Sequence, residues 1–409
     1  MKISALSVAA LVGMAVGANA AGFRLSMQDS RAAGMGNAVV AADDNASASW
    51  YNPAAITSLE GTNLELGSVM EAPAMKHKNT DGRTDKIDSV LHVPPHFYAT
   101  RKLGGNWALG LGVNVPFGLS TNWDKTSAET RTAATKSQIQ AVYSNLNAAY
   151  SITDKMSLAL GLAWVNLTAE MDKKIEVAGN NIEQKLTGDG TGVGYNAAAI
   201  YKPSDKLQFG ASFRSSVKIN VDGKIKLPTT GFLASLAADG PAKTKITLPD
   251  LFQAGVAYKY GDKWLFSADA DYTDWTTYRK LVIDYTTTAG VASQSIDYKN
   301  WKSVWAFRAG TEYKYSDAWK IRGGIFYDAN PVRDLNFETR VPDSNRVGFS
   351  AGAGYKKGSL TVDASLMFVT FLEREITKSY GSGTTVNPTL NGKYNAYAVL
   401  PALTLGYKF

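Results

Sequence analysis

The stretch that decides the fold is Lys206–Val221, which reads KLQFGASFRSSVKINV. Apart from Ser215, its odd-numbered positions are apolar: Leu207, Phe209, Ala211, Phe213, Val217, Ile219 and Val221. Successive side chains of a β-strand point to opposite faces, so this strand has one apolar face and one polar face. Its length exceeds that of most strands in soluble sandwiches. The pattern predicts a transmembrane barrel strand with the apolar face toward lipid and the polar face toward the lumen.

The same alternation recurs in 319–328, in 360–368 and in the C-terminal stretch 397–409. In the last of these, Phe409 falls on the apolar face together with Tyr407 and Leu405. A terminal aromatic residue in this phase resembles the C-terminal signal of bacterial outer-membrane proteins. We therefore expect the outer-membrane barrel assembly machinery to be a partner of the chain.

Short turns and long polar connections alternate strictly from residue 62 onward. The short turns lie at 103–106, 153–154, 203–205, 260–262, 315–317 and 357–358. The long connections cover 72–95, 117–138, 176–191, 223–244, 279–301, 329–344 and 374–393. Outer-membrane barrels have short periplasmic turns and long extracellular loops. These thirteen connections predict an all-β fold, a closed barrel of fourteen antiparallel strands over residues 62–409. Closure is expected because lipid cannot satisfy the free edges of an open sheet.

The first sixty-one residues do not alternate and are predicted to serve two other purposes. Residues 1–20 have a cationic start, a mostly apolar run and the cleavage site Ala18-Asn19-Ala20, which is typical of a signal peptide. A membrane anchor is the disfavoured alternative, because the run is short and has no stop-transfer flank. Residues 21–61 are rich in small side chains. They are predicted to plug the lumen, since a fourteen-stranded barrel is wider than its own side chains fill.

Composition argues against several classes of protein. The chain has no Cys, which excludes disulfides, thiol catalysis and Cys-ligated metals. Its three histidines are His77, His92 and His96, and two prolines between the last two prevent a helical metal-binding face. Neither a nucleophile elbow nor a Walker loop occurs. The net charge of +7 includes no basic cluster of the kind that binds nucleic acid. We therefore expect no enzyme activity, no cofactor, no metal site and no nucleic-acid partner.

Motifs along the whole mature chain resemble the FadL family of outer-membrane transporters for hydrophobic compounds. They include Gly34–Ala38 (GMGNA), Tyr51–Ala54 (YNPA), Phe213–Ile219 (FRSSVKI), Tyr272–Trp275 (YTDW) and Val341–Arg346 (VPDSNR). The resemblance implies a fourteen-stranded barrel, here expected to be a monomer, that is plugged by an N-terminal hatch. It also implies passive transport of hydrophobic small molecules. The expected location is the outer membrane, as an integral multi-pass barrel in contact with the lipid bilayer and lipopolysaccharide.

Two sites follow from the resemblance. Asn52, Pro53 and Ala54 match the hatch motif; the alternative is a simple turn, which Asn-Pro often starts. Pro116, Phe117 and Gly118 are the candidate lateral opening: Phe117-Gly118-Leu119 fits a family kink that opens the barrel wall sideways, although Pro116 departs from the family's form; the alternative is that the third strand ends there. Proline cannot donate to a sheet ladder and glycine often marks a bulge, so broken pairing is expected at this point.

Basic residues predicted to face the lumen are candidates for binding a ligand carboxylate. They are Arg214, Lys218, Lys302, Lys173 and Lys174. The family's carboxylate-contacting positions have no clean counterpart here, and Lys173, Lys174 and Lys299 are the nearest basic residues. For most inward charges, structural ion pairs are the favoured interpretation, because buried charges are normally paired. This applies to Arg308, Arg322, Asp269, Asp271, Glu312, Asp328 and Asp363.

The favoured function is energy-independent uptake of hydrophobic small molecules, above all long-chain fatty acids. The long loops 117–138 and 223–244 would capture the substrate, with Phe232, Leu233 and Leu236 as candidate contacts. Sideways exit into the bilayer suits an apolar solute, which then avoids periplasmic water. Uptake of monoaromatic hydrocarbons is an alternative that the sequence leaves open. A water-filled general porin and a barrel without transport activity are the other two.

Overall fold

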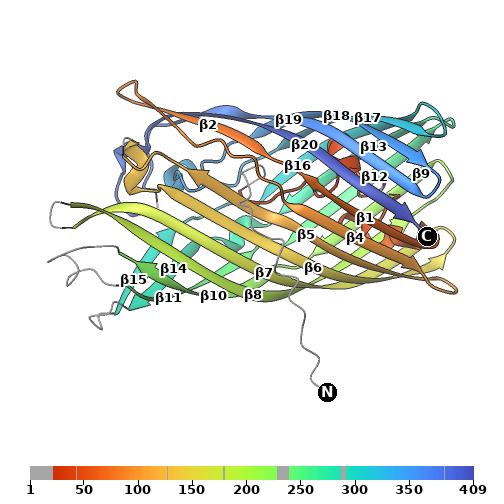
Figure 1. Cartoon of the computed structure of the whole chain (residues 1–409), viewed down its shortest axis with the longest axis horizontal. Coiled ribbons are helices and arrows are strands. Elements are labelled where there is room, and N and C mark those ends of the chain that lie inside the picture. Colours follow the sequence, from red (N-terminus) through yellow and green to blue (C-terminus); the bar gives the residue numbers. More distant parts are fainter. Residues whose placement is uncertain are drawn as a thin grey trace, which may run out of the picture.

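The computed structural model describes residues 22–42, 44–126, 128–177, 180–227, 239–286, 292–381 and 383–409. A single antiparallel sheet closes on itself into a barrel, whose long axis is horizontal in Figure 1. The seam joins β1 (Thr62–Val69) to β20 (Gly392–Lys408), which pair from Asn63 and Lys408 to Val69 and Ala402. The predicted signal sequence, 1–20, lies outside the described residues.

In the described part of the chain the barrel has fourteen strands, the predicted number. Eight are single segments: β5 (Trp107–Asn122), β6 (Lys136–Thr153), β7 (Met156–Val177), β8 (Asn180–Tyr201), β17 (Trp319–Asp328), β18 (Arg346–Lys357), β19 (Leu360–Ile376) and β20. Six consist of two successive segments: β1 with β2 (Ala72–Asn79), β3 (Thr84–Lys86) with β4 (Pro95–Lys102), β9 (Leu207–Arg214) with β10 (Val217–Lys226), β11 (Gly240–Leu248) with β12 (Leu251–Tyr260), β13 (Trp264–Thr273) with β14 (Lys280–Thr286), and β15 (Ala292–Tyr298) with β16 (Val304–Lys314).

Several predicted loop boundaries are wrong in the same direction, because strands continue into the expected loops. The predicted connection 72–95 contains β2 and β3, and the connection 279–301 contains β14 and β15. Conversely, the segment after β13 leaves the sheet in a short 3₁₀ helix, η5 (Trp275–Thr277). These strand extensions lie at the extracellular end, where the outer face no longer contacts hydrocarbon. An apolar outer face is not required there, so the alternation that marks a membrane strand disappears.

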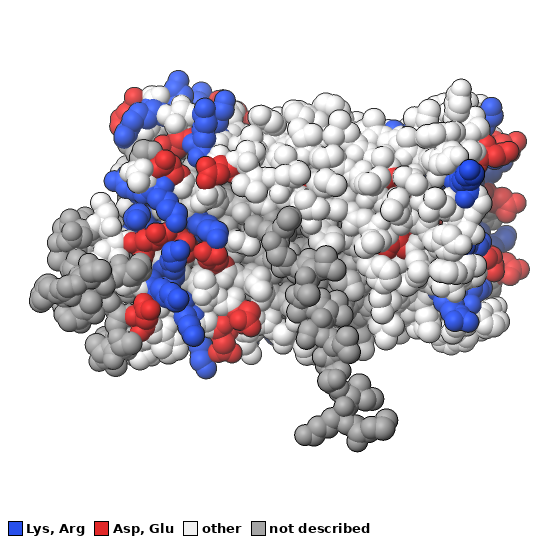
Figure 2. All heavy atoms as spheres, viewed as in Figure 1, with Lys and Arg blue, Asp and Glu red and all other residues white. Residues whose placement is uncertain are grey.

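The lipid-facing band of the barrel follows the predicted alternation. Large apolar side chains are exposed on the outer surface, as at Leu160 (69%), Ile325 (61%) and Phe349 (59%). Figure 2 shows an uncharged band between two belts of charged side chains at the ends of the barrel. Exposed apolar side chains at this density fit hydrocarbon as the surrounding solvent. No helix among the described residues is long and apolar enough to cross a membrane.

In the stretch 206–221, the predicted inward and outward orientation of the side chains is correct only for the first half. Through Arg214 the polar side chains point inward, but the strand breaks at Ser215 and Ser216, and beyond them the two faces exchange. Lys218, predicted to face the lumen, is exposed outside, and the side chains buried toward the lumen are those of Val217, Ile219 and Val221. The outer face of β10 lies in the charged belt beyond the apolar band, where a lysine remains hydrated and the inner face is free to be apolar.

The N-terminal segment, residues 22–58, lies inside the barrel and appears in red and orange in Figure 1. It contains α1 (Ser30–Gly34), α2 (Ala48–Tyr51) and the 3₁₀ helix η2 (Pro53–Ser58). The first helix contacts β17 to β20, and η2 contacts β4 to β8 on the opposite side. Glycines in the wall permit this packing: a Cβ at Gly210 would overlap the carbonyl oxygen of Val40. The remaining 3₁₀ turns are η3 (Glu129–Thr132), η6 (Asp334–Asn336) and η7 (Pro388–Leu390).

Deleting Phe409 should reduce the amount of folded protein in the outer membrane. The Phe409 backbone N–H donates to the Thr62 carbonyl oxygen (2.9 Å) at the seam, and its ring lies 4.7 Å from that of Tyr407 on the outer face. Loss of both contacts weakens the pairing at the C-terminal end of β20, the strand that closes the barrel. Heat-modifiable mobility of membrane fractions on gels measures the effect, with Phe409→Tyr as the control. Equal amounts of folded protein from the deletion and wild-type chains would contradict the expectation.

Candidate functional site

An apolar cavity lies inside the extracellular part of the barrel. The space in it that a water-sized sphere can enter is small, about 60 Å³. Strands β5, β6, β7, β11 and β14 supply its apolar lining, which includes Leu119, Ile139, Leu167, Met171, Ile246 and Leu281. Phe23 of the N-terminal segment contributes to the cavity from within the lumen. The exchange of faces beyond the lipid band therefore produces an apolar interior under a polar exterior, the reverse of the membrane-spanning region.

Aromatic rings pack around Phe23 at one side of this cavity. The centroid of its ring lies 4.6 Å from that of Trp275 and 5.8 Å from that of Tyr278. Phe117 and Trp301 complete the group, at 6.1 and 5.7 Å from Phe23. Trp275 and Tyr278 come from η5 and the residue after it, so the break between β13 and β14 is what turns these rings inward.

The cavity ends at a cluster of buried charges. Asp297 accepts from Arg340 (2.5 Å) and lies 3.8 Å from Lys299, and Glu338 pairs with both Lys299 and Arg340. Lys173 lines an adjoining cavity together with Asp297 and Arg340. Among the described residues Lys173 has no ion-pair partner within 4.0 Å. The cluster therefore contains three cationic groups and two carboxylates.

The basic residues predicted to bind a ligand carboxylate lie in different parts of the structure. Lys173 joins the charged cluster, whereas Lys174, the next residue of β7, points to the opposite face of the strand. Lys302 is exposed on the outer side of the barrel, like Lys218, so neither of the two can reach a ligand in the cavity. The break between β15 and β16 changes the phase that placed Lys302 inside.

Arg214 does face the lumen, but its guanidinium is already occupied. It donates to the carbonyl oxygen of Trp50 and to Oδ1 of Asn145 (3.0 Å), and lies 3.8 Å from the centroid of the Trp50 ring. The side chain therefore anchors α2 to the wall. A ligand carboxylate would have to displace these contacts before it could bind there.

Three members of the charged cluster are not among the ligand-binding residues that the sequence predicts. Glu338 and Arg340 belong to the connection 329–344, which was predicted to be an extracellular loop, and Asp297 belongs to β15 within another such connection. The 329–344 connection folds into the barrel mouth, where Phe337 and Thr339 are fully buried. Apolar residues within a charged loop, at Phe337 and Val341, are the signal that could have indicated this inward fold.

The hatch motif is fully buried within the N-terminal segment. Asn52 Nδ2 donates to the carbonyl oxygens of Val40 (2.8 Å) and Ala199 (3.1 Å), and its Oδ1 accepts from the N–H of Ala54 (3.2 Å). Pro53 takes the first position of η2, where its missing N–H is not needed. Asn52 thus caps η2 through its side chain and also ties the segment to β8.

Ion-pair networks join the N-terminal segment to the opposite wall. Arg24 contacts Asp271 (3.1 Å), which also accepts from Arg308 (3.1 Å). Arg31 and Arg322 both contact Glu312, at 3.3 and 2.7 Å. Arg308 further pairs with Asp328, and Arg322 with Asp363. Most inward charges are therefore structural, and breaking one partner would leave a buried charge uncompensated.

The barrel wall is locally broken at Pro116–Gly118, although β5 itself continues to Asn122. Asn114 pairs with Tyr143 and Phe117 with Ala141, so two residues of β5 oppose one of β6 in a bulge. On its other edge β5 pairs with β4 only as far as Val113. Beyond that point the N–H of Leu25 donates to Pro116 O and the N–H of Gly118 donates to Phe23 O, both at 2.8 Å. Residues 23–25 thus occupy the edge that β4 leaves free.

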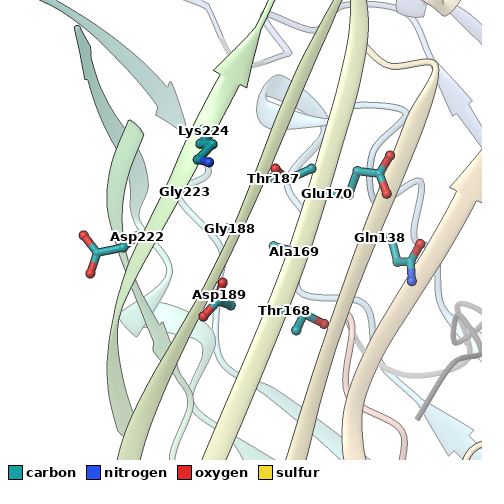
Figure 3. Close-up of a pocket in the computed structure, with 10 residues that line it drawn as sticks. All are labelled: Gln138, Thr168, Ala169, Glu170, Thr187, Gly188, Asp189, Asp222, Gly223 and Lys224. Carbon is teal, nitrogen blue, oxygen red and sulfur yellow. The ribbon is translucent and has the colours of Figure 1, made fainter. Parts of the chain in front are cut away.

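A second depression lies at the strands β6, β7, β8 and β10, and its lining is drawn in Figure 3. It is lined mainly by polar and small residues, among them Glu170, Asp189 and Asp222. Such a surface does not suit an apolar solute. The loop candidates Phe232, Leu233 and Leu236 lie outside the described residues. The part of the chain that the structure describes contains no group of three or more His, Asp or Glu side chains suited to a metal ion.

Comparison with known proteins identifies the family to which the chain belongs. The family model described as outer membrane protein transport protein (OMPP1/FadL/TodX) matches residues 11–409. Outer membrane protein P1 of Haemophilus influenzae is 26% identical, with 99% of this chain and 98% of that protein covered. The long-chain fatty acid transport protein of Escherichia coli is 25% identical, with 92% of this chain and 94% of that protein covered.

Solved structures show the same fold. A FadL homologue from Pseudomonas aeruginosa superposes with a TM-score of 0.84 at 18% identity, with 95% of this chain and all of that chain covered. The Pseudomonas putida toluene transporter TodX superposes with a TM-score of 0.73 at 16% identity, with 96% and 99% covered. The chain belongs to the OMPP1/FadL/TodX family of outer-membrane transport proteins.

Proposed function

We propose that this chain carries long-chain fatty acids passively across the outer membrane. The observation that carries the proposal is the charged cluster at the end of the apolar cavity, with three cations, Lys173, Lys299 and Arg340, against two carboxylates. A fatty acid would place its alkyl chain in the cavity and its carboxylate beside Lys173. One ligand carboxylate balances the cluster, and charge-assisted hydrogen bonds are the strong ones in such a site.

Monoaromatic hydrocarbons are a second candidate, and the group of rings around Phe23 favours them. Edge-to-face packing of aromatic rings contributes about 0.5–1.5 kcal/mol beyond the burial of area. A neutral aromatic solute would use these rings and make no use of Lys173. The two candidates therefore differ in which end of the cavity determines affinity.

The route onward follows from the N-terminal segment, which we assign as the hatch. It fills the lumen, so a continuous water-filled pore is disfavoured. Residues 23–25 line the cavity at Phe23 and also occupy the free edge of β5. Withdrawal of this short stretch would open the wall beside Pro116–Gly118 between β4 and β5. A substrate leaving there would pass from the cavity into the bilayer without crossing water.

The cluster can be tested by Lys173→Gln with Lys174→Gln as the matched control. Loss of a charged hydrogen-bonding partner costs about 1.5–3 kcal/mol, so the Kd for oleate should rise about tenfold or more. Lys174→Gln, on the other face of the same strand, should bind oleate normally. Binding is measured by calorimetry on purified protein, with toluene as a neutral ligand whose affinity should not change. Unchanged oleate affinity in Lys173→Gln would rule out the carboxylate assignment.

The hatch can be tested by replacing Asn52 and Pro53 together with alanine. The variant loses the two hydrogen bonds from Asn52 Nδ2 to Val40 and Ala199, each worth about 1 kcal/mol. We expect a folded barrel with impaired uptake of labelled oleate by whole cells. Asn63→Ala, on a half-buried asparagine of β1 whose Nδ2 also donates two hydrogen bonds, is the control. Normal uptake at normal surface expression would argue against a role for the motif in transport.

The lateral opening can be tested by Gly118→Arg, which adds a long charged side chain to β5 where its N–H donates to Phe23 O. Uptake should fall while binding of oleate to the purified protein persists, because the site of substitution already lacks its ladder to β4. Gly104→Arg, in an open periplasmic turn, is the control. Normal transport by Gly118→Arg would exclude exit at this position, and loss of both binding and transport would indicate misfolding.

A further inference from the structure

The barrel wall has another break, between β11 and β14. Strands β11 and β14 pair only at three positions, from Ala242 and Tyr285 to Thr244 and Ile283. On the membrane side, β12 and β13 pair fully as far as Leu251 and Thr273. Between these two ladders, residues 245–250 of one strand face residues 274–282 of the next without strand pairing.

Side chains replace the missing ladder along this gap. The hydroxyl of Thr244 donates to the carbonyl oxygen of Val282 (2.6 Å), and the hydroxyl of Thr277 donates to the carbonyl oxygen of Thr247 (3.4 Å). At the lower end of the gap the backbone N–H of Asp274 donates to Asp250 O (3.0 Å). Two hydroxyl contacts are weaker and easier to separate than a continuous ladder, because each is a single bond on a rotatable side chain.

A cleft on the outer surface lies over this gap and shares lining residues with the inner cavity. Its lining includes Lys243, Lys245 and Thr247 of β11, with Thr277 of η5 and Lys280 of β14. Three further residues of its lining, Val221, Thr244 and Tyr278, also line the apolar cavity inside the barrel. These three side chains therefore border both the outer cleft and the inner cavity.

The depression in Figure 3 provides a useful contrast. It too shares residues with the cavity, namely Gln138 and Ala169. There, however, the ladder is unbroken, since Ala169 pairs with Gly188 and Gly188 pairs with Gly223. Backbone hydrogen bonds close that part of the wall, whereas the gap between β11 and η5 is bridged by two hydroxyl contacts and by the single backbone bond at its lower end.

We propose that the gap between β11 and η5–β14 is a lateral inlet, through which amphiphilic anions pass from the outer leaflet into the apolar cavity. This inference rests on the proposed transport function and adds a route of access to it. The gap lies just outside the apolar band, which ends at the exposed rings of Phe252 and Trp305. An amphiphile lying in the leaflet has its headgroup at this level.

The charges at the rim suit an anionic headgroup. Lys243 lies 3.4 Å from Asp222, but Lys245 and Lys280 have no ion-pair partner within 4.0 Å among the described residues. Both are exposed in the belt of charged residues that borders the cleft. A carboxylate would be attracted to these two lysines while its alkyl chain entered past Thr244 and Tyr278, and the cavity beyond offers the second cationic site near Lys173.

The absence of cysteine from the chain permits a direct test by a reversible lock. The register of β11 and β14 pairs Lys243 with Asp284, and its continuation would bring Lys245 opposite Val282 in the gap. In the double variant Lys245→Cys, Val282→Cys, oxidation would form a disulfide across the gap and hold it closed. Reduction would break that disulfide and free the gap. The matched control, Lys185→Cys with Lys226→Cys, ties a position of the β8–β10 ladder that is already paired and lies outside the cleft. Uptake of labelled oleate is compared before and after reduction in cells expressing each variant.

Oxidation of the gap variant should lower uptake more than about fivefold, reversibly on reduction, because a gate that cannot open stops passage. The control pair should change less than about twofold, since tying strands that are already paired moves nothing. A second variant, Thr277→Trp, fills the cleft without a disulfide and should also lower uptake. Thr276→Trp, on the exposed side of η5, is its control and should not.

Unchanged uptake in both the oxidised gap variant and Thr277→Trp would overturn the inlet, provided that heat-modifiable mobility shows folded barrels. A reduced variant that takes up no oleate while wild type does would likewise count against it, because a free gap should conduct. If wild type itself neither binds nor takes up oleate or toluene, the proposed transport function fails instead.

Discussion

A backbone N–H or C=O left unpaired in hydrocarbon costs several kcal/mol, and this constraint governs where the wall closes and where it opens. It requires β1 and β20 to pair along the seam. It also means that a break in the ladder needs replacement partners. At β5 the replacement is the backbone of residues 23–25. The break between β11 and β14 lies just outside the hydrocarbon, so water can reach its backbone, and the hydroxyls of Thr244 and Thr277 bridge it. The two breaks therefore differ in what must move before a solute can pass.

Alternation in the sequence was sufficient to predict an all-β barrel and its strand number, because the lipid band imposes an apolar outer face on every strand. It was insufficient to predict which face is outside beyond that band. Arg214 and Lys218 are four residues apart on the same predicted face, yet one is buried at 4% exposure and the other lies outside. A period of two looks identical on either side of the Ser215–Ser216 break. Only the level of the hydrocarbon boundary determines the phase, and the sequence does not mark it.

The candidate site was harder to predict for a related reason. Its charged end combines Lys173 of β7, Asp297 of β15 and Arg340 of an inward-folded loop, residues that are brought together only by closure of the barrel. Loop residues carry no periodicity, so nothing in 329–344 indicated an inward direction beyond the apolar Phe337 and Val341. Hydrophobic residues in a loop are themselves common. The paired charges were easier to anticipate, since a buried Arg308 or Arg322 requires an acidic partner wherever the fold places it.

The position of the N-terminal segment has a consequence for the order of assembly. Ser30 and Thr404 lie 374 residues apart in sequence, yet their hydroxyl oxygens are 2.7 Å apart in the lumen. Gly22 likewise donates to Asp343 in the loop at the barrel mouth (2.8 Å). A chain that precedes the first strand cannot be threaded sideways through a finished wall. Its contacts with Thr404 and Asp343 can therefore form only while the sheet is still curling or by entry through an open end of the barrel.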